Sequence, residues 1–449
     1  MGRVRFISKC TVQPANPHES IQRIELNQWD LRFLPVHYIQ KGLLYLKPTF
    51  RPGKEEENEV INLLKTSLSR TLDFFVPLAG RLATTSHDDD TMSVFIDCND
   101  AGAEFIHASA DFTVADILDP PYTPRVVYSF FPLNGVVNFE GITKPLLAVQ
   151  VTELTDGIFV ACTVNHVVAD GTSFWHFFNS WSEICRGADR ISRPPVLQRW
   201  FPTGTNCPVR FSISNKEKFS VRYTPPPLEE RVFQFTKEKI ASLKAKANTE
   251  CGTDRISSLQ AILAHIWRSV ARARGLDSDQ EICYWLIIGK RSRLKPPLPD
   301  EHFGCFVEGG TATAKVGELL DRGLGWAAWL LNQVVASHND PTAEKSLVES
   351  QTKQPKFVSM DSIVYNNLLL TGSSPRFNVY GNDLGWGRPL AVRSGCGNKF
   401  DGKITVFQGR SEGSVDVEAC LSPQTLMVLG DDAEFMDAVT VFPTFAGIN

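Results

Sequence analysis

The chain has 449 residues, which is too many for one ordinary hydrophobic core and predicts two domains, or three. Hydrophobic residues make up 43% and charged residues 21%, the balance of a globular protein in water. The net charge of -4 argues against a nucleic-acid binder, because neutralising phosphates needs a basic surface.

The start of the chain, MGRVRFISKC, lacks the apolar segment of a signal peptide, and Phe6 departs from the myristoylation pattern. No apolar run approaches the ~18 residues of a membrane span. The ten cysteines include no C-x-x-C pair, so neither a zinc site nor a thioredoxin-type redox motif is expected. We therefore expect reduced thiols, no metal site and a cytoplasmic protein.

Short apolar strands and amphipathic helices alternate along the first half. Val60, Leu64, Leu68 and Leu72 form one stripe at helical spacing, and PLAGRL then ends the predicted helix. Alternating apolar residues in MSVFIDC and PLLAVQVTEL predict strands. GIFVACTV is apolar enough to be a buried strand over about 158–164.

The chain changes character at 199–227, where FPTGTNCP and TPPPLEE interrupt the apolar runs. We predict a domain at 1–205, a crossover at 206–227 and a second domain at 228–449. A helix should follow in ISSLQAILAHIWRSVARARG, with one face formed by Leu259, Ile262, Leu263, Ile266, Trp267 and Val270. Later strands are predicted at ICYWLIIG, RFNVYG, KITVFQG and SVDVEACL.

His166 and Asp170 lie four residues apart in NHVVADG, between the predicted buried strand and an aromatic-rich helix. We expect Thr172 or Ser173 to cap that helix. His166 then occupies a turn at the carboxyl end of a buried strand, where open α/β sheets place their ligand sites. Because imidazole titrates near neutrality, His166 is a candidate general base.

Two other interpretations of this histidine stay open at this point. His166 could be a hydrogen-bonded structural residue, as most histidines after strands are. It could also bind a metal with Asp170 and His302, although no spacing supports that third ligand. His176 and His265 face aromatic or aliphatic helix surfaces and are assigned to packing.

HVVADG resembles the H-x-x-x-D-G motif of the BAHD acyltransferases, plant enzymes that use coenzyme A thioesters. DLGWG, at 383–387, resembles the family's second block, D-F-G-W-G. Shorter pieces are also similar and occur in family order over nearly the whole chain: WDL, PLAGRL, SSLQAILAHIWR, RSRLKPPLP and NKFDGKITVFQGRSEGSVDVEACLSP.

The resemblance implies an α/β fold of two similar-sized domains, of the chloramphenicol acetyltransferase-like type. Each domain would be a mixed sheet flanked by helices. A channel would run between them with the motif histidine at its middle, acyl-CoA entering from one face and the acceptor from the other. Acyl-CoA would be a co-substrate, with no tightly bound cofactor and no metal.

The resemblance also implies roles for the residues of the first motif. His166 would take a proton from the attacking hydroxyl or amine and return it to the leaving thiolate, without a covalent intermediate. Asp170 would point away from the imidazole and pair with an arginine, which Arg291 matches best and Arg293 second. Gly171 would permit a close backbone approach at the start of the helix.

In the second block, Asp383 would hold a loop by pairing with a basic residue, and Gly385 and Gly387 would serve the same structural motif. Trp386 could donate its indole N–H to an oxyanion, or it could be a packed aromatic. Ser373 is a comparable donor candidate. Contacts to coenzyme A are predicted for Ser257, Ser258, Ser373 and Arg376.

Three positions depart from the family pattern. Leu384 replaces the usual Phe, which alters packing and removes no chemistry. Cys305 stands where the family commonly has Asn, so the shape of the acceptor channel there is open. Lys290 stands where many members have an acidic or small residue, and it either favours an acidic substrate or decorates the surface.

The leading hypothesis is acyl transfer from an acyl-CoA to an alcohol or amine acceptor of plant specialised or surface-lipid metabolism. We expect a monomer that binds no nucleic acid. One alternative keeps the fold but serves a lyase or hydrolase that acts on an acidic metabolite without coenzyme A. The other is a non-catalytic metabolite-binding protein, which would not need a base.

Overall fold

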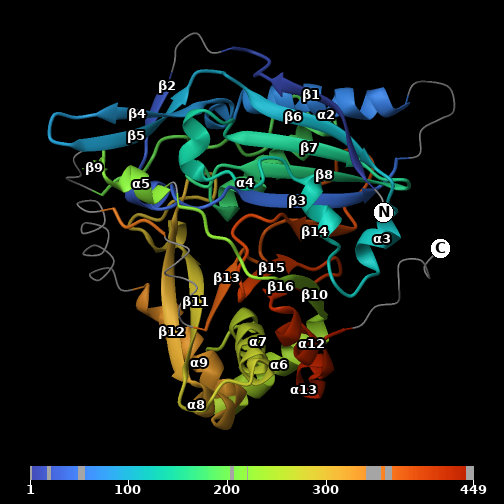
Figure 1. Cartoon of the computed structure of the whole chain (residues 1–449), viewed down its shortest axis with the longest axis vertical. Helices are drawn as coiled ribbons and strands as arrows, with labels where there is room; N and C mark the ends of the chain where they lie inside the picture. Colours follow the sequence, from blue (N-terminus) through green and yellow to red (C-terminus); the bar gives the residue numbers. More distant parts are fainter. Residues whose placement is uncertain are drawn as a thin grey trace.

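The structure is a computed structural model. It describes residues 3–17, 22–48, 56–202, 207–219, 221–339, 355–358 and 367–440, with the backbone alone at 56–58. Two six-stranded sheets form the upper and lower parts of the molecule in Figure 1. Each sheet lies against its own large hydrophobic cluster, one containing Trp29 and Trp181, the other Trp267 and Tyr284. The protein is therefore mixed α/β with two sheet-containing parts, as expected.

The upper sheet is mixed, because β6 and β7 run parallel while the other pairs are antiparallel. Its strands, in order across the sheet, are β1 (Val4–Val12), β6 (Ala103–Ala110), β7 (Leu147–Glu153), β8 (Gly157–Val164), β3 (Ile39–Leu46) and β14 (Ala391–Ser394). β7 and β8 are buried along their whole length, which explains why their sequences are almost continuously apolar.

A small antiparallel sheet accompanies the upper one. It consists of β2 (Gln22–Glu25), β5 (Thr91–Cys98) and β4 (Arg81–Ser86), and β5 also pairs with β9 (Phe211–Ser212). The helical segments of this part are α1 (Gln28–Leu31), α2 (Glu56–Leu72), η1 (Val76–Ala79), α3 (Val114–Leu118), η2 (Arg125–Phe130), η3 (Asn138–Ile142), α4 (Gly171–Cys185) and α5 (Asn215–Phe219).

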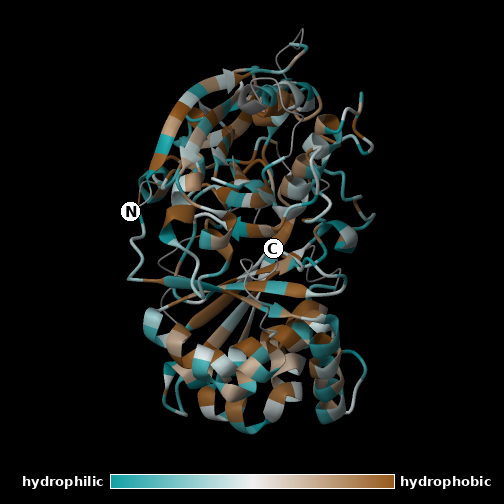
Figure 2. Cartoon of the chain, turned by 90° about the vertical axis from the view of Figure 1, so that its right-hand side faces the viewer, coloured by the Kyte–Doolittle hydropathy of each residue, from teal (hydrophilic) through white to brown (hydrophobic). Residues whose placement is uncertain are grey.

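The lower sheet is also mixed, with β13 parallel to both of its neighbours. Its order is β10 (Glu229–Phe235), β16 (Val415–Leu421), β15 (Lys403–Gln408), β13 (Leu368–Gly372), β11 (Glu281–Gly289) and β12 (Val307–Lys315). The helices beneath it are α6 (Lys237–Cys251), α7 (Ser258–Arg274), α8 (Val316–Asp321), α9 (Gly323–Ser337), α12 (Pro423–Asp431) and α13 (Ala433–Ala438), whereas η4 (Arg291–Arg293) contacts the upper part through Arg291. Hydropathy alternates around these helices (Figure 2), as expected for helices with one buried face.

The upper part contains segments from both halves of the sequence. β14 comes from the second half of the sequence, yet it pairs with β3 and completes the upper sheet. The predicted crossover at 206–227 lies with the upper part where it is described, because β9 pairs with β5 there. The boundary itself stays a prediction. No helix in the described part of the chain is both long and apolar enough to cross a membrane.

Most predicted elements are confirmed, including the strands at β5, β7, β8, β11, β15 and β16 and the helices α2 and α7. The strand predicted at RFNVYG is wrong. Residues 376–381 form turns and bends and pair with no strand. The Asn382 side chain donates to the carbonyls of Asn378 and Val379 and closes a turn instead.

The predicted cap of α4 is also wrong, by two or three residues. The N-cap is Asp170, whose carboxylate accepts the backbone N–H of Ser173 at 2.9 Å. A carboxylate satisfies a free helix N–H at least as well as a hydroxyl and also suits the positive end of the helix dipole. Thr172 and Ser173 therefore lie inside the first turn of α4.

Candidate active site

The turn that carries His166 follows β8 directly and is held by two asparagines. Asn165 donates its backbone N–H to Leu146 and accepts the N–H of Val167 on its side chain at 3.0 Å. The side-chain oxygen of Asn138 accepts the backbone N–H of His166 at 2.6 Å. The two asparagines therefore hold the backbone of the turn in place, and the His166 side chain is not needed to satisfy these N–H groups.

The imidazole of His166 stacks flat on the ring of Phe33, with 4.1 Å between ring centroids and 2° between planes. Its Nδ1 lies 3.7 Å from Cys305 Sγ, a long and weak contact, and the backbone of the turn, at His166 itself and at Ala169, also hydrogen-bonds to the ring. Burial, helped by the charge of Lys403, lowers the pKa of His166 to about 4, although the backbone hydrogen bonds and the Asp170 charge act in the opposite direction. The ring is thus neutral at pH 7, the form that accepts a proton.

Asp170 is fully buried and turned away from His166. Its carboxylate accepts from Arg291 Nη1 at 2.6 Å and Nη2 at 3.2 Å, and from the backbone N–H of Phe306 at 3.0 Å. Burial alone would raise the pKa of Asp170, but the Arg291 guanidinium and the backbone donors outweigh it and hold the pKa below its usual value. Asp170 is ionised and fully paired.

Arg291 completes this cluster by donating to the carbonyls of His302 and Gly304 and to the hydroxyl of Ser173. Arg293, the second choice for this partner, instead donates to Asn339 and Gly289. Arg291 comes from the second half of the sequence. The ion pair therefore joins the two halves directly behind the histidine turn.

A second buried ion pair, which the sequence did not reveal, holds the same turn. Arg199 Nε lies 3.0 Å from Asp30 Oδ2, and its Nη2 donates to the carbonyl of Val168. Asp30 Oδ1 accepts the backbone N–H of Cys305 at 2.9 Å. Asp30 belongs to the WDL segment that resembles the family. The resemblance itself implied no role for this aspartate.

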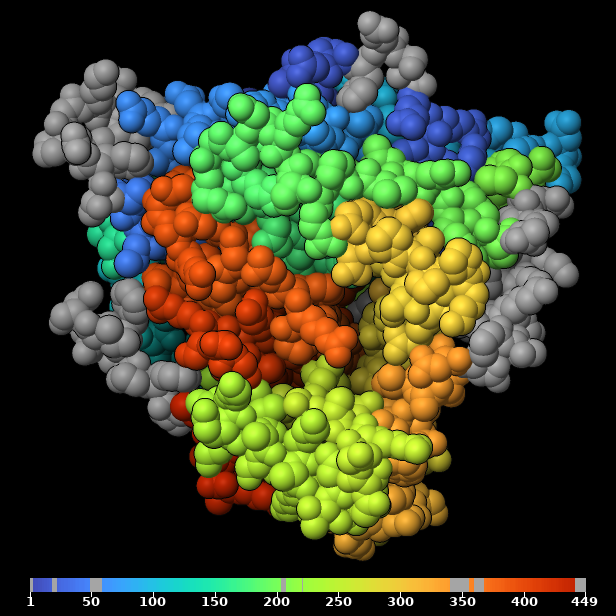
Figure 3. All heavy atoms as spheres, turned by 180° about the vertical axis from the view of Figure 1, so that it is seen from behind, coloured from blue at the N-terminus to red at the C-terminus, as the bar shows by residue number. Residues whose placement is uncertain are grey.

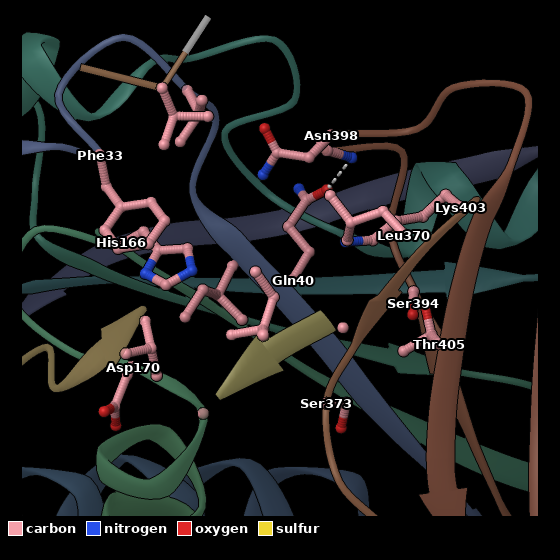
Figure 4. A pocket seen from close by; sticks show the side chains of 18 of the residues that line it. Phe33, Gln40, His166, Asp170, Leu370, Ser373, Ser394, Asn398, Lys403 and Thr405 are labelled. Atoms are coloured by element: carbon pink, nitrogen blue, oxygen red, sulfur yellow. Dashed lines mark hydrogen bonds between the residues drawn. The ribbon is translucent and has the colours of Figure 1, made fainter. Parts of the chain in front are cut away.

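Beside His166 lies a cavity of about 1250 Å³ of empty space, including its openings to solvent. Its walls come from both halves of the chain (Figure 4): Phe33, Gln40 and His166 from the first, and Leu370, Ser373 and Lys403 from the second. Seen from behind, the molecule is hollowed where the yellow and orange segments of the second half approach each other (Figure 3).

Most of the exposed surface of this cavity is apolar, but polar and charged side chains also line it. Ser373 is one of them, and its Oγ is buried without a hydrogen-bond partner in the described part of the chain. Its backbone is left-handed, with φ of 70°, just beyond the end of β13. Such strain in a non-glycine residue often accompanies a functional position.

The second sequence block folds into a loop outside the cavity. The Asp383 carboxylate accepts the backbone N–H groups of Gly385 at 2.8 Å and Gly387 at 2.9 Å. Both glycines have positive φ, 105° and 113°, which a side chain would disfavour. A basic residue does contact Asp383, but Arg186 binds its backbone carbonyl at 2.6 Å, whereas the pairing was expected at the side chain.

Trp386 does not line the cavity. Its ring packs edge-on against Tyr45, with 6.0 Å between centroids, and its Nε1 is buried without a partner in the described residues. This arrangement favours the packed aromatic over the oxyanion donor. Gly171 does line the cavity, and a Cβ there would come within 2.9 Å of the Phe377 ring. The close approach is thus to a side chain.

The other predicted coenzyme A contacts lie away from His166. Ser257 caps α7 by accepting the N–H of Gln260 at 3.3 Å, and Ser258 begins that helix. Arg376 is exposed, near the amino-terminal half of α4, and lines a separate hollow. Of the four residues, the structure brings only Ser373 to the histidine cavity.

The two unusual residues are both buried. Cys305 Sγ donates to the backbone carbonyl of His166 at 2.7 Å, so it supports the turn from behind. Lys290 is also buried, beside the carbonyl of His338, so it does not decorate the surface. Neither residue is part of the cavity wall.

Sequence reasoning missed three lysines of the cavity wall, Lys41, Lys399 and Lys403, which line it together with Arg32. Lys399 and Lys403 lie in the family-like segment NKFDGKITVFQG, but that similarity assigned no role to them, and Lys41 lies in no such segment. Among the described residues, no group of three or more His, Cys, Asp or Glu side chains could hold a metal ion. The carbonyl of His302, the third ligand considered, faces Arg291.

Comparison with known proteins defines the class. A family model described as the Transferase family matches residues 2–436. The chain is 40% identical to an uncharacterised acetyltransferase of Arabidopsis thaliana over 447 residues, which covers 97% of this chain and 99% of that protein. It is 35% identical to the BAHD acyltransferase DCR of Arabidopsis thaliana over 459 residues, with 97% and 92% covered.

A solved structure agrees with this assignment. The crystal structure of vinorine synthase superposes with a TM-score of 0.73 and 21% identity, over 97% of this chain and 98% of that one. The chain belongs to the BAHD family, and it has the two-domain fold of coenzyme A-dependent acyltransferases. It is therefore an acyl-CoA-dependent acyltransferase.

Proposed function

We propose that His166 is the general base of an acyl transfer from an acyl-CoA thioester to a hydroxyl or amine acceptor. The observation that carries this proposal is a neutral imidazole on the wall of a cavity that both halves of the chain form. An acceptor becomes acidic only as it attacks, so a base within hydrogen-bond reach lowers the barrier.

The protons and electron pairs balance without a covalent enzyme intermediate. The acceptor oxygen or nitrogen attacks the thioester carbonyl while His166 takes its proton. The tetrahedral adduct then collapses, the C–S bond breaks, and the imidazolium returns the proton to the thiolate. A low pKa in the free enzyme makes the imidazolium a strong acid in this second step.

Asp170 and Arg291 would act as positioning residues. Their ion pair and the backbone donors around it fix the turn and the start of α4. Neither side chain belongs to the hydrogen-bond contacts recorded for the imidazole. Their loss should therefore reduce folding stability and the amount of active enzyme together.

Ser373 is the best-placed donor for the oxyanion of the tetrahedral adduct. Its hydroxyl is unpaired in the described part of the chain and lines the same cavity as His166 (Figure 4). A donor that has no other partner loses nothing when charge develops beside it. Ser257, Ser258 and Arg376 stay predictions for contact with the distal part of coenzyme A.

Plant specialised or surface-lipid metabolism is the proposed setting, since both relatives above are plant proteins. The cytoplasmic location and the monomeric state stay predictions from the sequence. The largely apolar lining of the cavity supports an acyl chain or a ring as the group that fills it.

The test is release of free thiol by the purified protein from a panel of acyl-CoAs with alcohol and amine acceptors. His166→Ala and His166→Gln should lose about 10²–10⁴-fold in kcat/KM, the usual contribution of a general base. His87→Gln is the control, because His87 lies in the turn between β4 and β5 and contacts only Ser93 among described side chains. It should leave the rate unchanged.

The pH profile gives a second readout. Because the pKa of His166 is lowered to about 4, the wild-type rate should persist on the acid side to about pH 5. Turnover of a substrate without coenzyme A would instead identify a lyase or hydrolase. Full activity of His166→Ala would remove the histidine from the mechanism.

A further inference from the structure

Three lysines converge on the wall of the active-site cavity. Lys41 is on β3, Lys403 is the first residue of β15, and Lys399 lies in the segment just before it. Figure 4 shows Lys403 across the cavity from His166, with its side chain reaching inward from its strand. A positive wall opposite the reacting centre is not required by proton transfer itself.

The carboxylates of this region are already used by one of the three lysines. Lys399 Nζ donates to Glu230 Oε2 at 2.8 Å and to Glu418 Oε1 at 2.7 Å. The remaining oxygens accept from Tyr128 and from the backbone N–H of Ser394. Burial alone would lower the pKa of Lys399, but these two carboxylates outweigh it and keep it protonated.

Lys41 and Lys403 have no such partners. Lys41 Nζ donates to the Ser394 hydroxyl at 2.7 Å and lies 5.0 Å from the centre of the Phe407 ring. The Lys403 ammonium group has no hydrogen bond or ion pair within the part of the chain that the structure describes, where the neighbouring Glu230 and Glu418 carboxylates bind Lys399. The cluster thus holds three ammonium groups against two carboxylates.

This excess of lysines over carboxylates makes the protonated forms of Lys41 and Lys403 less stable in the enzyme without ligand. Burial, followed by repulsion from Lys41 and Lys399, lowers the pKa of Lys403 to about 7. Burial also lowers the pKa of Lys41 to about 8. A buried amine without a counter-ion loses its proton more easily than in water, and an opposite charge that binds beside it restores the protonated form. Here the missing charge would be delivered from the cavity that both lysines line.

We propose that the ammonium groups of Lys403 and Lys41 bind a carboxylate of the substrate, on a side of the cavity remote from the thioester carbon. This inference rests on the proposed function, since it names the chemistry of the molecule that His166 acts on. The apolar wall around Phe33, Leu370 and Trp285 would hold the carbon skeleton between the carboxylate and the reacting group.

The carboxylate can come from either partner of the reaction, and matched substrates distinguish the two sources. Glutaryl-CoA and pentanoyl-CoA differ in a terminal carboxylate on the acyl chain. With pentanoyl-CoA as donor, 3-hydroxybenzoate and 3-hydroxybenzamide differ in a carboxylate on the acceptor. The phosphates of coenzyme A itself are a third source of negative charge, so free coenzyme A is measured as well.

The variants are Lys403→Met and Lys41→Met, with Lys403→Arg as the charge-retaining rescue and Lys246→Met as an exposed lysine control on α6. The wild type should favour the acid over its neutral match in one of the two pairs. Lys403→Met should lose about 10- to 100-fold of that preference, the value of a hydrogen bond to a charged group. Turnover of the neutral match should change by less than about 3-fold, and Lys403→Arg should recover part of the preference.

The affinity of the lysine site for a carboxylate can also be measured without catalysis. Calorimetric affinity for 3-hydroxybenzoate and for glutarate should fall in Lys403→Met, and in the wild type it should weaken from pH 7 to pH 9 as the lysines lose their protons. The lysine proposal is overturned if acid and neutral substrates are used equally and neither acid binds. It is also overturned if only the affinity for free coenzyme A depends on Lys403.

These outcomes are distinct from failure of the proposed function. Absence of His166-dependent thiol release with every donor and acceptor would remove the transferase mechanism, whereas the calorimetric result would still decide whether Lys403 binds a carboxylate.

Discussion

Two buried charged clusters lie on different sides of His166, and they differ in how completely their charges are paired. Behind the turn, the Asp170 carboxylate meets the Arg291 guanidinium and two backbone N–H groups. Across the cavity, the positive charges of Lys41 and Lys403 repel each other, while the nearby carboxylates of Glu230 and Glu418 are bound to Lys399. One cluster is complete in the free protein, and the other has an excess of positive charge.

The difference separates structural charge from charge that is available to a ligand. A fully paired buried ion pair fixes the geometry of its surroundings, and its removal on one side leaves an uncompensated charge. An unpaired charge on a cavity wall destabilises the empty protein and gains most when an opposite charge binds. Substitutions in the two clusters should therefore change stability in opposite directions.

The largest effect is expected from breaking the complete cluster. Asp170→Ala leaves Arg291 buried without its carboxylate and removes the cap of α4, which should cost about 3–5 kcal/mol of unfolding free energy. Denaturant unfolding of the purified variant measures this loss. Asp437→Ala, at an exposed pair with Lys239, is the control and should change stability by less than about 1 kcal/mol. A loss for Asp170→Ala no larger than this control would contradict the structural role.

An unpaired polar atom should contribute to catalysis only when it faces the cavity. Ser373 Oγ and Trp386 Nε1 both lack partners among the described residues, but only Ser373 lines the cavity. Ser373→Ala should reduce kcat about 10²-fold with a small change in KM, the effect of losing one oxyanion donor. Trp386→Phe should stay within about 3-fold in steady-state kinetics. The reverse order of the two effects would restore Trp386 as the donor.

The smallest effect is a gain in stability when the incomplete cluster is relieved. Lys403→Met should stabilise the protein without ligand by about 1–2 kcal/mol near pH 7, because it removes a partly buried cation that has no ion-pair partner among the described residues. The pKa of Lys403 is lowered from 10.5 to about 7 by folding, so the unfolded chain binds more protons between these values. Its contribution to stability therefore rises with pH through that window.

Denaturant unfolding of wild type and Lys403→Met at pH 7.0, 7.5, 8.0 and 8.5 tests this sign. The advantage of the variant should shrink as the pH rises, because the wild-type lysine becomes neutral. Lys246→Met should show no such trend. A wild type that is more stable than Lys403→Met without ligand would mean that Lys403 is compensated within the protein.

The sequence predicted much of the local structure, and its errors have physical causes. The apolar periods of β8 and α7 specify those elements, since burial of one face or of a whole strand is written in residue order. The cap of α4 was misplaced because Asp170, Thr172 and Ser173 are all good capping residues and only the backbone angles select one. RFNVYG was misread because its alternation could not show that the Asn382 side chain binds the carbonyls of Asn378 and Val379 and closes a turn there.

The site divides in the same way. The motif marked His166, Asp170 and Gly171 because they are adjacent in the chain, and the resemblance to the family added Arg291. The lysines could not be found, because Lys41 and Lys403 are about 360 residues apart and meet only through the sheets and the cavity between them.

The order of residues by itself determined which segments form strands and helices, and that a histidine follows a buried strand, because hydrophobic periods and capping residues act over short distances. Only the tertiary structure decided that Arg199 pairs with Asp30, that β14 joins the upper sheet, and that two lysines face the cavity without an ion-pair partner. Each of these depends on which distant groups share a low-dielectric space, and the energy of a buried charge is set by those neighbours.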